Sequence, residues 1–315
     1  LAFAVKVPMF PLHTWLPAAH VEAPTAGSVI LASIMLKMGG YGFLRFCLPI
    51  APEATFYFMP WLIALSLVSI VVGGYLALGQ SDIKKLIAYS SVGHMGFVTL
   101  GIFLLNDQGI KGAMLQMINH GITTGALFIL IGIIYERTHS REMSVNSALG
   151  AMMPLFVLFL GIFSLSSFGF PGTNSFVSEF LVLLAAFAKY PLVGAIAVVG
   201  AILAAAYMLR LLQRMVWADS DGHGHHHEDE EEGEGHHALR DLNPREIGTL
   251  SFLVIFVFWI GFYPAPLLNI MDASVAHLLQ QVEAGMGGGD AGETLHALSG
   301  LGDRVAELIS SVTNF

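Results

Sequence analysis

Five residues that can gain or lose a proton fall within hydrophobic stretches of this 315-residue chain: Lys6, Lys37, His94, His120 and Glu179. A charged side chain at the centre of a membrane helix costs about 2.5–3.5 kcal/mol on insertion scales, so such residues need a partner or a function. Burial disfavours the charged forms of lysine and glutamate, and histidine titrates near neutral pH without any perturbation. A row of these groups, joined by water, has the chemistry of a proton relay.

Each of the five residues also has a structural explanation. Lys6 could extend its ammonium to a membrane interface. For Lys37 this is harder, because it follows the start of its segment by about twelve residues and so lies near the membrane midplane. Glu179 could be the buried partner of a base, and the two histidines could bond nearby hydroxyls or carbonyls. A purely structural role for all five residues together is the weaker interpretation.

The segments that carry these residues have the composition of membrane helices. The sequence is 55% hydrophobic and only 12% charged, whereas soluble domains carry roughly 25% charged residues. Apolar runs of about 20 residues, the length that crosses a bilayer, recur along the chain. We therefore predict an all-α polytopic membrane protein with spans near residues 1–20, 25–48, 56–79, 83–105, 109–136, 152–188, 191–217 and 246–264.

Two of the predicted spans are interrupted by proline and glycine, in "KVPMFPLHTWLP" at 6–17 and "FGFPGTNSFVSEF" at 168–180. They are the first and sixth spans, so they cross the membrane in opposite directions, as inverted repeats require. Interrupted helices in corresponding places of two halves indicate a transporter's ion site. Two proline kinks without a role are the alternative. For His20 and Glu22, at the end of the first segment, one interpretation is that they cap the following helix.

Lysine and arginine are distributed unequally between the two sets of loops. The larger set carries eight of them: Lys84, Lys85, Arg137, Arg141, Arg210, Arg214, Arg240 and Arg245. The opposite set carries four: Arg45, Lys111, Lys189 and Arg304. The positive-inside rule places the larger set in the cytoplasm. The loop at 218–245, rich in histidine and acids, is then cytoplasmic and the C-terminus lies outside. Because this loop lacks the fixed ligand spacing of a zinc site, we expect a solvated linker there.

Other chemistry finds no support in the sequence. There is no nucleotide-binding loop, CxxC pair, haem motif or nucleophilic triad, and the single Cys47 excludes an internal disulfide. The net charge of −9 is concentrated in 219–237 and in the tail, so it does not indicate a nucleic-acid partner. The tail, 265–315, has apolar residues at helical spacing and predicts amphipathic surface helices or partial disorder. Because the first residue is a leucine within an apolar stretch, we expect the chain to be a C-terminal portion of a longer polypeptide.

Three stretches carry a resemblance to a known family: "KVPMFPLHTWLPAAHVEAPTAGSVILASIMLKMGGYGFLRF", "DIKKLIAYSSVGHMGF" and "FPGTNSFVSEF". They resemble the antiporter-like membrane subunits of respiratory NADH:quinone oxidoreductase, and among these the subunit M family, called chain 4 in mitochondria. The resemblance covers about residues 1–275. A glutamate at position 179, where the longer subunit L has a lysine, favours subunit M. The superfamily also includes subunits of Na⁺/H⁺ antiporters and membrane-bound hydrogenases.

The resemblance implies an antiporter-like fold of fourteen helices with two inverted five-helix repeats and two discontinuous helices. This chain would hold helices seven to fourteen only, with Lys6 on the broken seventh helix, Lys37 on the eighth and Glu179 on the broken twelfth. The expected regions are 1–48 (end of the first repeat), 49–217 (second repeat), 218–245 (loop), 246–264 (last transmembrane helix) and 265–315 (amphipathic tail). The family pairs the lysine at position 6 with a glutamate on a fifth helix that this chain lacks. The tail beyond about 280 has no counterpart.

The function implied by the resemblance is proton translocation across a bacterial inner membrane, coupled to quinone reduction. Lys6, Lys37, Glu179, His94 and His120 would be its proton-relay groups, and the chain would hold no metal or redox centre. NADH, FMN, iron–sulfur clusters and quinone are expected elsewhere in the complex, and the partners are other membrane-arm subunits and the lipid bilayer. A subunit of an Na⁺/H⁺ antiporter or of a membrane-bound hydrogenase is one alternative. A membrane scaffold, whose charges only hold neighbouring subunits, is another.

Overall fold

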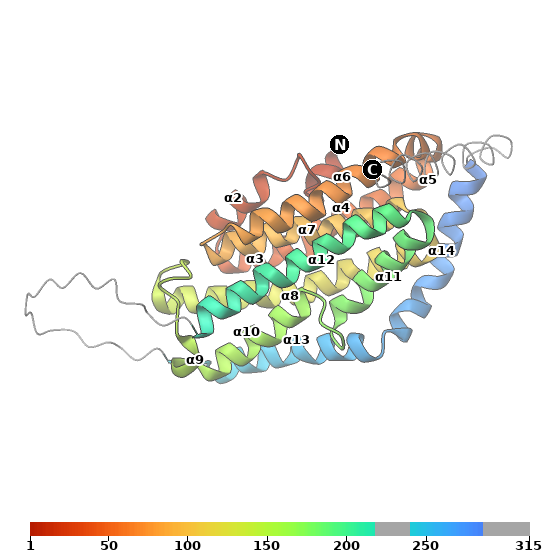
Figure 1. Cartoon of the computed structure of the whole chain (residues 1–315). Coiled ribbons are helices and arrows are strands. Elements are labelled where there is room, and N and C mark those ends of the chain that lie inside the picture. Colours follow the sequence, from red (N-terminus) through yellow and green to blue (C-terminus); the bar gives the residue numbers. More distant parts are fainter. Residues whose placement is uncertain (218–239, 286–315) are drawn as a thin grey trace, which may run out of the picture.

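The computed structural model describes residues 1–217 and 240–285, which form a bundle of long helices (Figure 1). Within these two ranges no β-strand is present, and Asp82 and Glu142 form an isolated bridge between two loops. Six helical stretches are long and apolar enough to cross a membrane: Thr25–Ile50, Pro52–Leu78, Ile83–Phe103, Asp107–Thr138, Pro191–Trp217 and Pro244–Phe262. The predicted all-α polytopic fold is confirmed.

The bundle is built from these helices, in chain order: α1 (Ala2–Lys6), α2 (Trp15–Glu22), α3 (Thr25–Ile30), η1 (Leu31–Met35), α4 (Leu36–Gly42), η2 (Phe43–Cys47), α5 (Leu48–Ile50), α6 (Pro52–Leu78), α7 (Ile83–Phe103), α8 (Asp107–Thr138), α9 (Leu149–Met152), α10 (Pro154–Ser167), α11 (Asn174–Lys189), α12 (Pro191–Leu212), η3 (Gln213–Trp217), α13 (Pro244–Phe262) and α14 (Ala265–Gly285). The three η elements are π-helical turns. Elements α3 to α5 follow one another without a break and make one span.

Both predicted interruptions are present. Residues 7–14 separate α1 from α2, and residues 168–173 separate α10 from α11. In the second break Gly169 and Gly172 have φ values of 74° and 93°, a left-handed backbone that glycine adopts without steric cost. The two discontinuous helices predicted from the proline and glycine pattern are therefore confirmed.

Helices α7 and α8 lie at the centre of the bundle, and almost the whole length of α7 is buried. Glycines allow close approach here: a Cβ on Gly96 would lie 3.0 Å from the carbonyl oxygen of Ser66 on α6. On α8, Gly121 faces η1, and the Ser33 hydroxyl donates a 3.0 Å hydrogen bond to its carbonyl oxygen. Close contact through small residues is typical of helix packing in membranes.

The connections 79–82, 139–148 and 240–243 lie at the same end of the bundle as the α2–α3 junction (Figure 1). Lys84, which the sequence suggests only as a marker of sidedness, is buried to 8% exposure, and its Nζ donates to the Ala23 carbonyl at 2.7 Å. Arg141 donates to the Val21 carbonyl at 2.9 Å. These two cations therefore hold the last carbonyls of α2, where positive charge also suits the helix dipole.

The first part of the tail forms a helix, α14, which turns away from α13 and crosses toward α5 (Figure 1). Lys111 on α8 fixes it through an ion pair with Asp272, with Nζ and Oδ1 2.6 Å apart. The solvated linker was predicted at 218–245, and residues 218–239 of it lie outside the described ranges. The tail from residue 286 onward also lies outside them.

Candidate functional site

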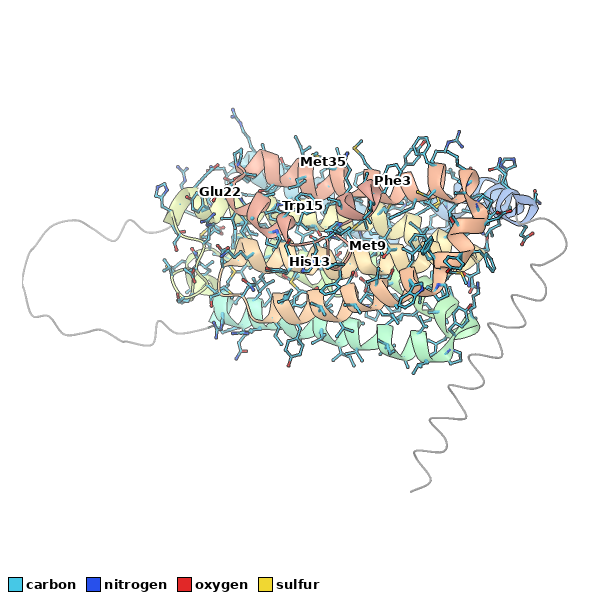
Figure 2. The ribbon with its side chains drawn as sticks, turned by 90° about the horizontal axis from the view of Figure 1, so that it is seen from above. Phe3, Met9, His13, Trp15, Glu22 and Met35 are labelled. Carbon is cyan, nitrogen blue, oxygen red and sulfur yellow. The ribbon has the colours of Figure 1, made fainter. Side chains whose placement is uncertain are left out.

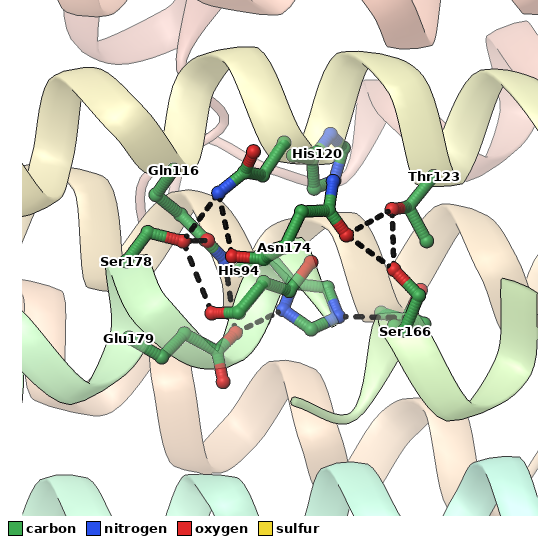
Figure 3. Close-up of polar contacts among 12 residues, drawn as sticks. His94, Gln116, His120, Thr123, Ser166, Asn174, Ser178 and Glu179 are labelled. Carbon is green, nitrogen blue, oxygen red and sulfur yellow. Dashed lines mark hydrogen bonds and ion pairs between the residues drawn. The ribbon is translucent and has the colours of Figure 1, made fainter. Parts of the chain in front are cut away.

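Four of the five predicted residues form one row inside the bundle. Nζ of Lys37, on α4, lies 2.6 Å from Nδ1 of His120, on α8. The His120 ring stands edge-on to the ring of His94, on α7, with 5.6 Å between ring centroids. Nδ1 of His94 lies 2.9 Å from Oε1 of Glu179, on α11. Figure 3 shows the part of this row from His120 to Glu179.

The row consists of two bonded pairs, Lys37–His120 and His94–Glu179. The rings of His120 and His94 are not joined by a direct hydrogen bond, and this gap is the middle step of the row. Hydroxyl and amide side chains surround this step, contributed by Gln116, Thr123, Thr124, Ser167 and Ser175. The space they enclose has no room for a water molecule. A proton can therefore cross each pair directly, whereas the middle step requires a movement of the rings or the entry of water.

Three members of the row are almost completely removed from solvent, and Lys37 is half-buried. His94, His120 and Glu179 are 4%, 2% and 4% exposed. Buried charges are stable only where they are paired and hydrogen-bonded. Both requirements are met at Glu179, since Gln116 Nε2 donates to the same Oε1 at 2.9 Å. Gln116 in turn accepts a 2.5 Å hydrogen bond from Ser178 Oγ.

Local backbone features place the two ends of the row. The π-helical turn η1 ends two residues before Lys37, whose ammonium also donates to the Ala32 carbonyl within that turn. Single π-helical turns inside α-helices are frequent at functional sites. At the other end, a Cβ on Gly169 would lie 3.1 Å from Glu179 Oε2, so the glycine of the α10–α11 break makes room for the carboxylate.

Polar residues that the sequence analysis did not single out extend the site (Figure 3). Asn119 Nδ2 donates to the Asn174 carbonyl at 2.8 Å and to Ser178 Oγ at 3.0 Å. Thr123 and Ser166 bond each other at 2.8 Å, and Ser166 donates to Asn174 Oδ1 at 2.6 Å. One signal was present in the sequence, because Gln116, Asn119, His120 and Thr123 recur at helical spacing and so share a face of α8.

Two residues of the first interrupted segment lie apart from the row. Lys6, at the end of α1, is exposed, and within the described residues its side chain makes no ion pair or hydrogen bond. Its place in a relay stays a prediction. The interpretation of His20 as a helix cap is wrong, because α3 begins after Pro24 without a side-chain cap and His20 is fully buried. Glu22 is exposed at the end of α2.

This geometry suits the transfer of protons within a membrane. Lysine, imidazole and carboxylate are each able to hold and release a proton, and they stand here in bonded pairs on four packed helices. Within residues 1–217 and 240–285, no group of three histidine, cysteine or acidic residues has an arrangement that would bind a metal.

Comparisons with known proteins agree with this architecture. The model of the NADH:quinone oxidoreductase/Mrp antiporter transmembrane family matches residues 1–204. The chain therefore belongs to this family of multi-pass membrane proteins.

Its similarity to curated relatives is high over most of the chain. It is 47% identical over 281 residues to NADH-ubiquinone oxidoreductase chain 4 of Chondrus crispus, covering 89% of this chain and 55% of the relative. It is 46% identical over 286 residues to NADH-quinone oxidoreductase subunit M of Rhodobacter capsulatus, covering 91% of this chain and 54% of the relative. The chain thus spans about half the length of these relatives.

A solved structure has the same fold. A chain of respiratory complex I from Thermus thermophilus with bound NADH superposes with a TM-score of 0.77 and 34% sequence identity, covering 88% of this chain and 57% of that chain. Relatives of this chain are thus subunits of multi-subunit membrane complexes.

Proposed function

We propose that this chain carries protons across the membrane as part of subunit M of a respiratory NADH:quinone oxidoreductase. The observation that carries the proposal is the row Lys37–His120–His94–Glu179, in which four titratable groups from four helices stand in bonded pairs and the last three are buried. The names of the relatives support the assignment to this complex, and the high identity over most of the chain favours it over an antiporter subunit.

Proton movement along the row follows from the bonding of each pair. The Lys37 ammonium gives a proton to Nδ1 of His120, which leaves a neutral amine and an imidazolium. The imidazolium passes a proton to His94 when the middle step closes or admits water. His94 then gives a proton from Nδ1 to the Glu179 carboxylate, which releases it toward the opposite face. After a transfer, His120 keeps its remaining proton on Nδ1, His94 keeps its remaining proton on Nε2, and Lys37 is a neutral amine. Before the next transfer each ring therefore has to turn over or exchange that proton, and Lys37 has to receive a new one.

Proton movement along the row is proposed to be driven by a change of charge at Lys6 and an acidic partner. These two residues exchange protons with Lys37. Electron transfer from NADH to quinone takes place in other subunits, which bind the FMN and the iron–sulfur clusters, and this chain neither binds nucleic acid nor carries a cofactor. The membrane is proposed to be a bacterial inner membrane. The loop end that holds Lys84, Arg137 and Arg141 faces the cytoplasm under the positive-inside rule.

The proposal is tested in inside-out vesicles that contain the full-length protein in its complex. NADH-driven acidification of the interior is compared for wild type, Lys37→Ala and Glu179→Gln, and the amount of assembled complex is measured in each. Lys85→Ala is the control, because it removes an exposed lysine near the start of α7. We expect both row variants to lose acidification while the complex stays assembled, and the control to behave as wild type.

Other outcomes would support other functions. If NADH-driven acidification is unchanged and a sodium pulse moves protons in wild type but not in Lys37→Ala, the chain is an antiporter subunit. If both row variants lose assembly rather than coupling, the charges serve a scaffold.

A further inference from the structure

The side-chain amide of Gln116, on α8, lies between two side chains of α11. Its Nε2 donates to Oε1 of Glu179 at 2.9 Å, and its Oε1 accepts a 2.5 Å hydrogen bond from Ser178 Oγ. All three side chains are buried, and Figure 3 shows them at the carboxylate end of the row. The amide therefore contacts the last group of the row, although the proton steps described above do not use it.

The two ends of this amide have nearly the same shape and opposite hydrogen-bonding chemistry. The NH₂ group is a donor and stabilises an ionised carboxylate, whereas the carbonyl oxygen is an acceptor and stabilises a carboxylic acid, which has an O–H to donate. In the observed orientation Gln116 presents Nε2 to Glu179 and so stabilises its charged form. A half-turn of the amide would present the oxygen instead and stabilise the neutral form.

Ser178 can pair with the amide in both orientations. A hydroxyl has one proton to donate and two lone pairs that accept. Ser178 Oγ lies within hydrogen-bond distance of Gln116 Oε1 and of the Ser175 carbonyl, at 2.5 and 3.0 Å, and it accepts from Asn119 Nδ2 at 3.0 Å. After a half-turn of the amide, the hydroxyl would donate to the Ser175 carbonyl and accept from Nε2 of Gln116, while it keeps the bond from Asn119. Neither orientation leaves an end of the amide without a partner.

The other groups around Glu179 leave this position to the amide. His94, on α7, bonds the same Oε1 at 2.9 Å, and Tyr207, on α12, bonds Nε2 of His94. Oε2 of the carboxylate faces Gly169, where a Cβ would lie 3.1 Å away. A proton that His94 delivers to Oε1 therefore arrives at the atom that Gln116 contacts.

The first interrupted segment has no equivalent of this amide. Residues 1–50 contain neither asparagine nor glutamine, and Figure 2 shows the course of this segment from Phe3 past His13 to Glu22. Glu22, its carboxylate, is exposed at the end of α2. Both interrupted segments lie within the described residues, and only the second combines a buried carboxylate with an amide that bonds it.

We propose that the amide of Gln116 makes a half-turn when Glu179 takes up a proton, and that this turn keeps the proton from returning to His94. The proposal rests on the proton translocation proposed above. In the loading step the Nδ1–H bond of protonated His94 breaks and an O–H bond forms at Oε1 of Glu179, which leaves both groups neutral. The turned amide then accepts this O–H at its oxygen and donates to Ser178, and no proton moves in this step. When Glu179 releases its proton toward the opposite face, the carboxylate regains its charge and the amide turns back.

The test uses the full-length protein in its complex, in the same inside-out vesicles. Infrared difference spectra between resting and NADH-driven membranes are recorded with glutamine that carries an isotope label at its side-chain carbonyl. The carboxyl band that Glu179→Gln removes belongs to Glu179, and the labelled amide band that Gln116→Met removes belongs to Gln116. Ser178→Ala, which removes the hydroxyl but keeps the amide, should shift the same amide band. The matched control is Gln108→Met, the same substitution at an exposed glutamine of α8.

In wild type we expect the carboxyl band of Glu179 and the amide band of Gln116 to appear together. Gln116→Met and Ser178→Ala should lose NADH-driven proton uptake by about tenfold, the order expected for a hydrogen bond to a charged group, while Gln108→Met behaves as wild type. A carboxyl band of Glu179 without a labelled amide band in wild type overturns the switch, whether or not the variants assemble. If Glu179→Gln loses uptake while Gln116→Met keeps it, the switch is overturned and the row stands. If Glu179→Gln itself keeps full uptake, the proposed function fails first.

Discussion

His94 and Glu179 form the most enclosed pair of the row, with Nδ1 of His94 2.9 Å from Oε1 of the carboxylate. A neutral imidazole has one donor and one acceptor nitrogen, so a carboxylate at Nδ1 leaves Nε2 as the acceptor. Nε2 has two hydroxyl neighbours, Tyr207 at 3.2 Å and Ser167 at 3.4 Å. When Glu179 is ionised, it favours the tautomer of His94 that has its proton on Nδ1 and an acceptor at Nε2.

Tyr207→Phe should weaken proton transfer without removing a member of the row. The hydroxyl orients Nε2 of His94, and a single hydrogen bond of this kind contributes about 0.5–1.5 kcal/mol, which corresponds to a roughly twofold to tenfold slower rate. NADH-driven proton uptake in vesicles measures the effect. Tyr41→Phe, which alters an exposed tyrosine, is the control and should change nothing. Equal rates in the two variants would contradict a role for the Tyr207 hydroxyl.

Lys37 and His120 should behave as one unit. Because their side chains bond each other at 2.6 Å, the loss caused by removing both should be smaller than the product of the two separate losses. The measurement is a double-mutant cycle of Lys37→Met, His120→Gln and the combined variant, read as proton uptake. A coupling energy of about 0.5–3 kcal/mol is typical of residues in contact. Strictly multiplicative losses would show that the two residues act independently.

Gly169→Ala should damage the site although it removes no polar group. The residue has a φ of 74°, which costs a non-glycine residue about 1–2 kcal/mol, and the new Cβ would lie 3.1 Å from Glu179 Oε2. We expect lower thermal stability of the assembled complex and reduced proton uptake. Gly161→Ala on α10 is the control, since a Cβ there meets no atom within 4 Å. The control should be neutral or slightly stabilising, because alanine favours a helix over glycine.

The ion pair of Arg137 and the two ion pairs of Lys111 should differ in their contribution to stability. Arg137 on α8 and Glu246 on α13 bond at 2.7 Å with side chains only 15% and 22% exposed, whereas the partners of Lys111, Asp107 and Asp272, are 50% and 54% exposed. Arg137→Gln leaves a half-buried carboxylate unpaired and should cost about 1–3 kcal/mol. Lys111→Gln should cost less than about 1 kcal/mol, as exposed pairs do. Thermal unfolding of the purified complex tests the order, and the reverse order would contradict it.

The helices and four members of the row could be predicted from the sequence, because both depend on local features. Long apolar runs define the spans, and isolated charges within them are costly enough to single out Lys37, His94, His120 and Glu179. The pairing was not predictable. Lys37 and His120 are 83 positions apart, and His94 and Glu179 are 85 apart, so their contacts depend on how four helices pack.

The proline-rich segment shows where sequence patterns fail. The positions of Pro8, Pro11 and Pro17 predict a break in the helix. They do not determine in which direction the chain continues after the break. For this reason a cap of the following helix is one interpretation that the sequence leaves for His20, whereas the residue lies buried against Phe128. Lys84 was placed with the loops on charge alone, although its ammonium enters the bundle to reach the Ala23 carbonyl.

If the row carries protons as proposed, the unbonded step between His120 and His94 would also keep the membrane from leaking protons. A continuous wire of hydrogen bonds from one face to the other would let protons return without work, and each return across 100 mV would release about 2.3 kcal/mol as heat. With their rings 5.6 Å apart and no space for water between them, the two histidines break that wire at rest. Under the proposed function, the insulation of the membrane and the passage of protons would depend on the same movement of the two histidine rings.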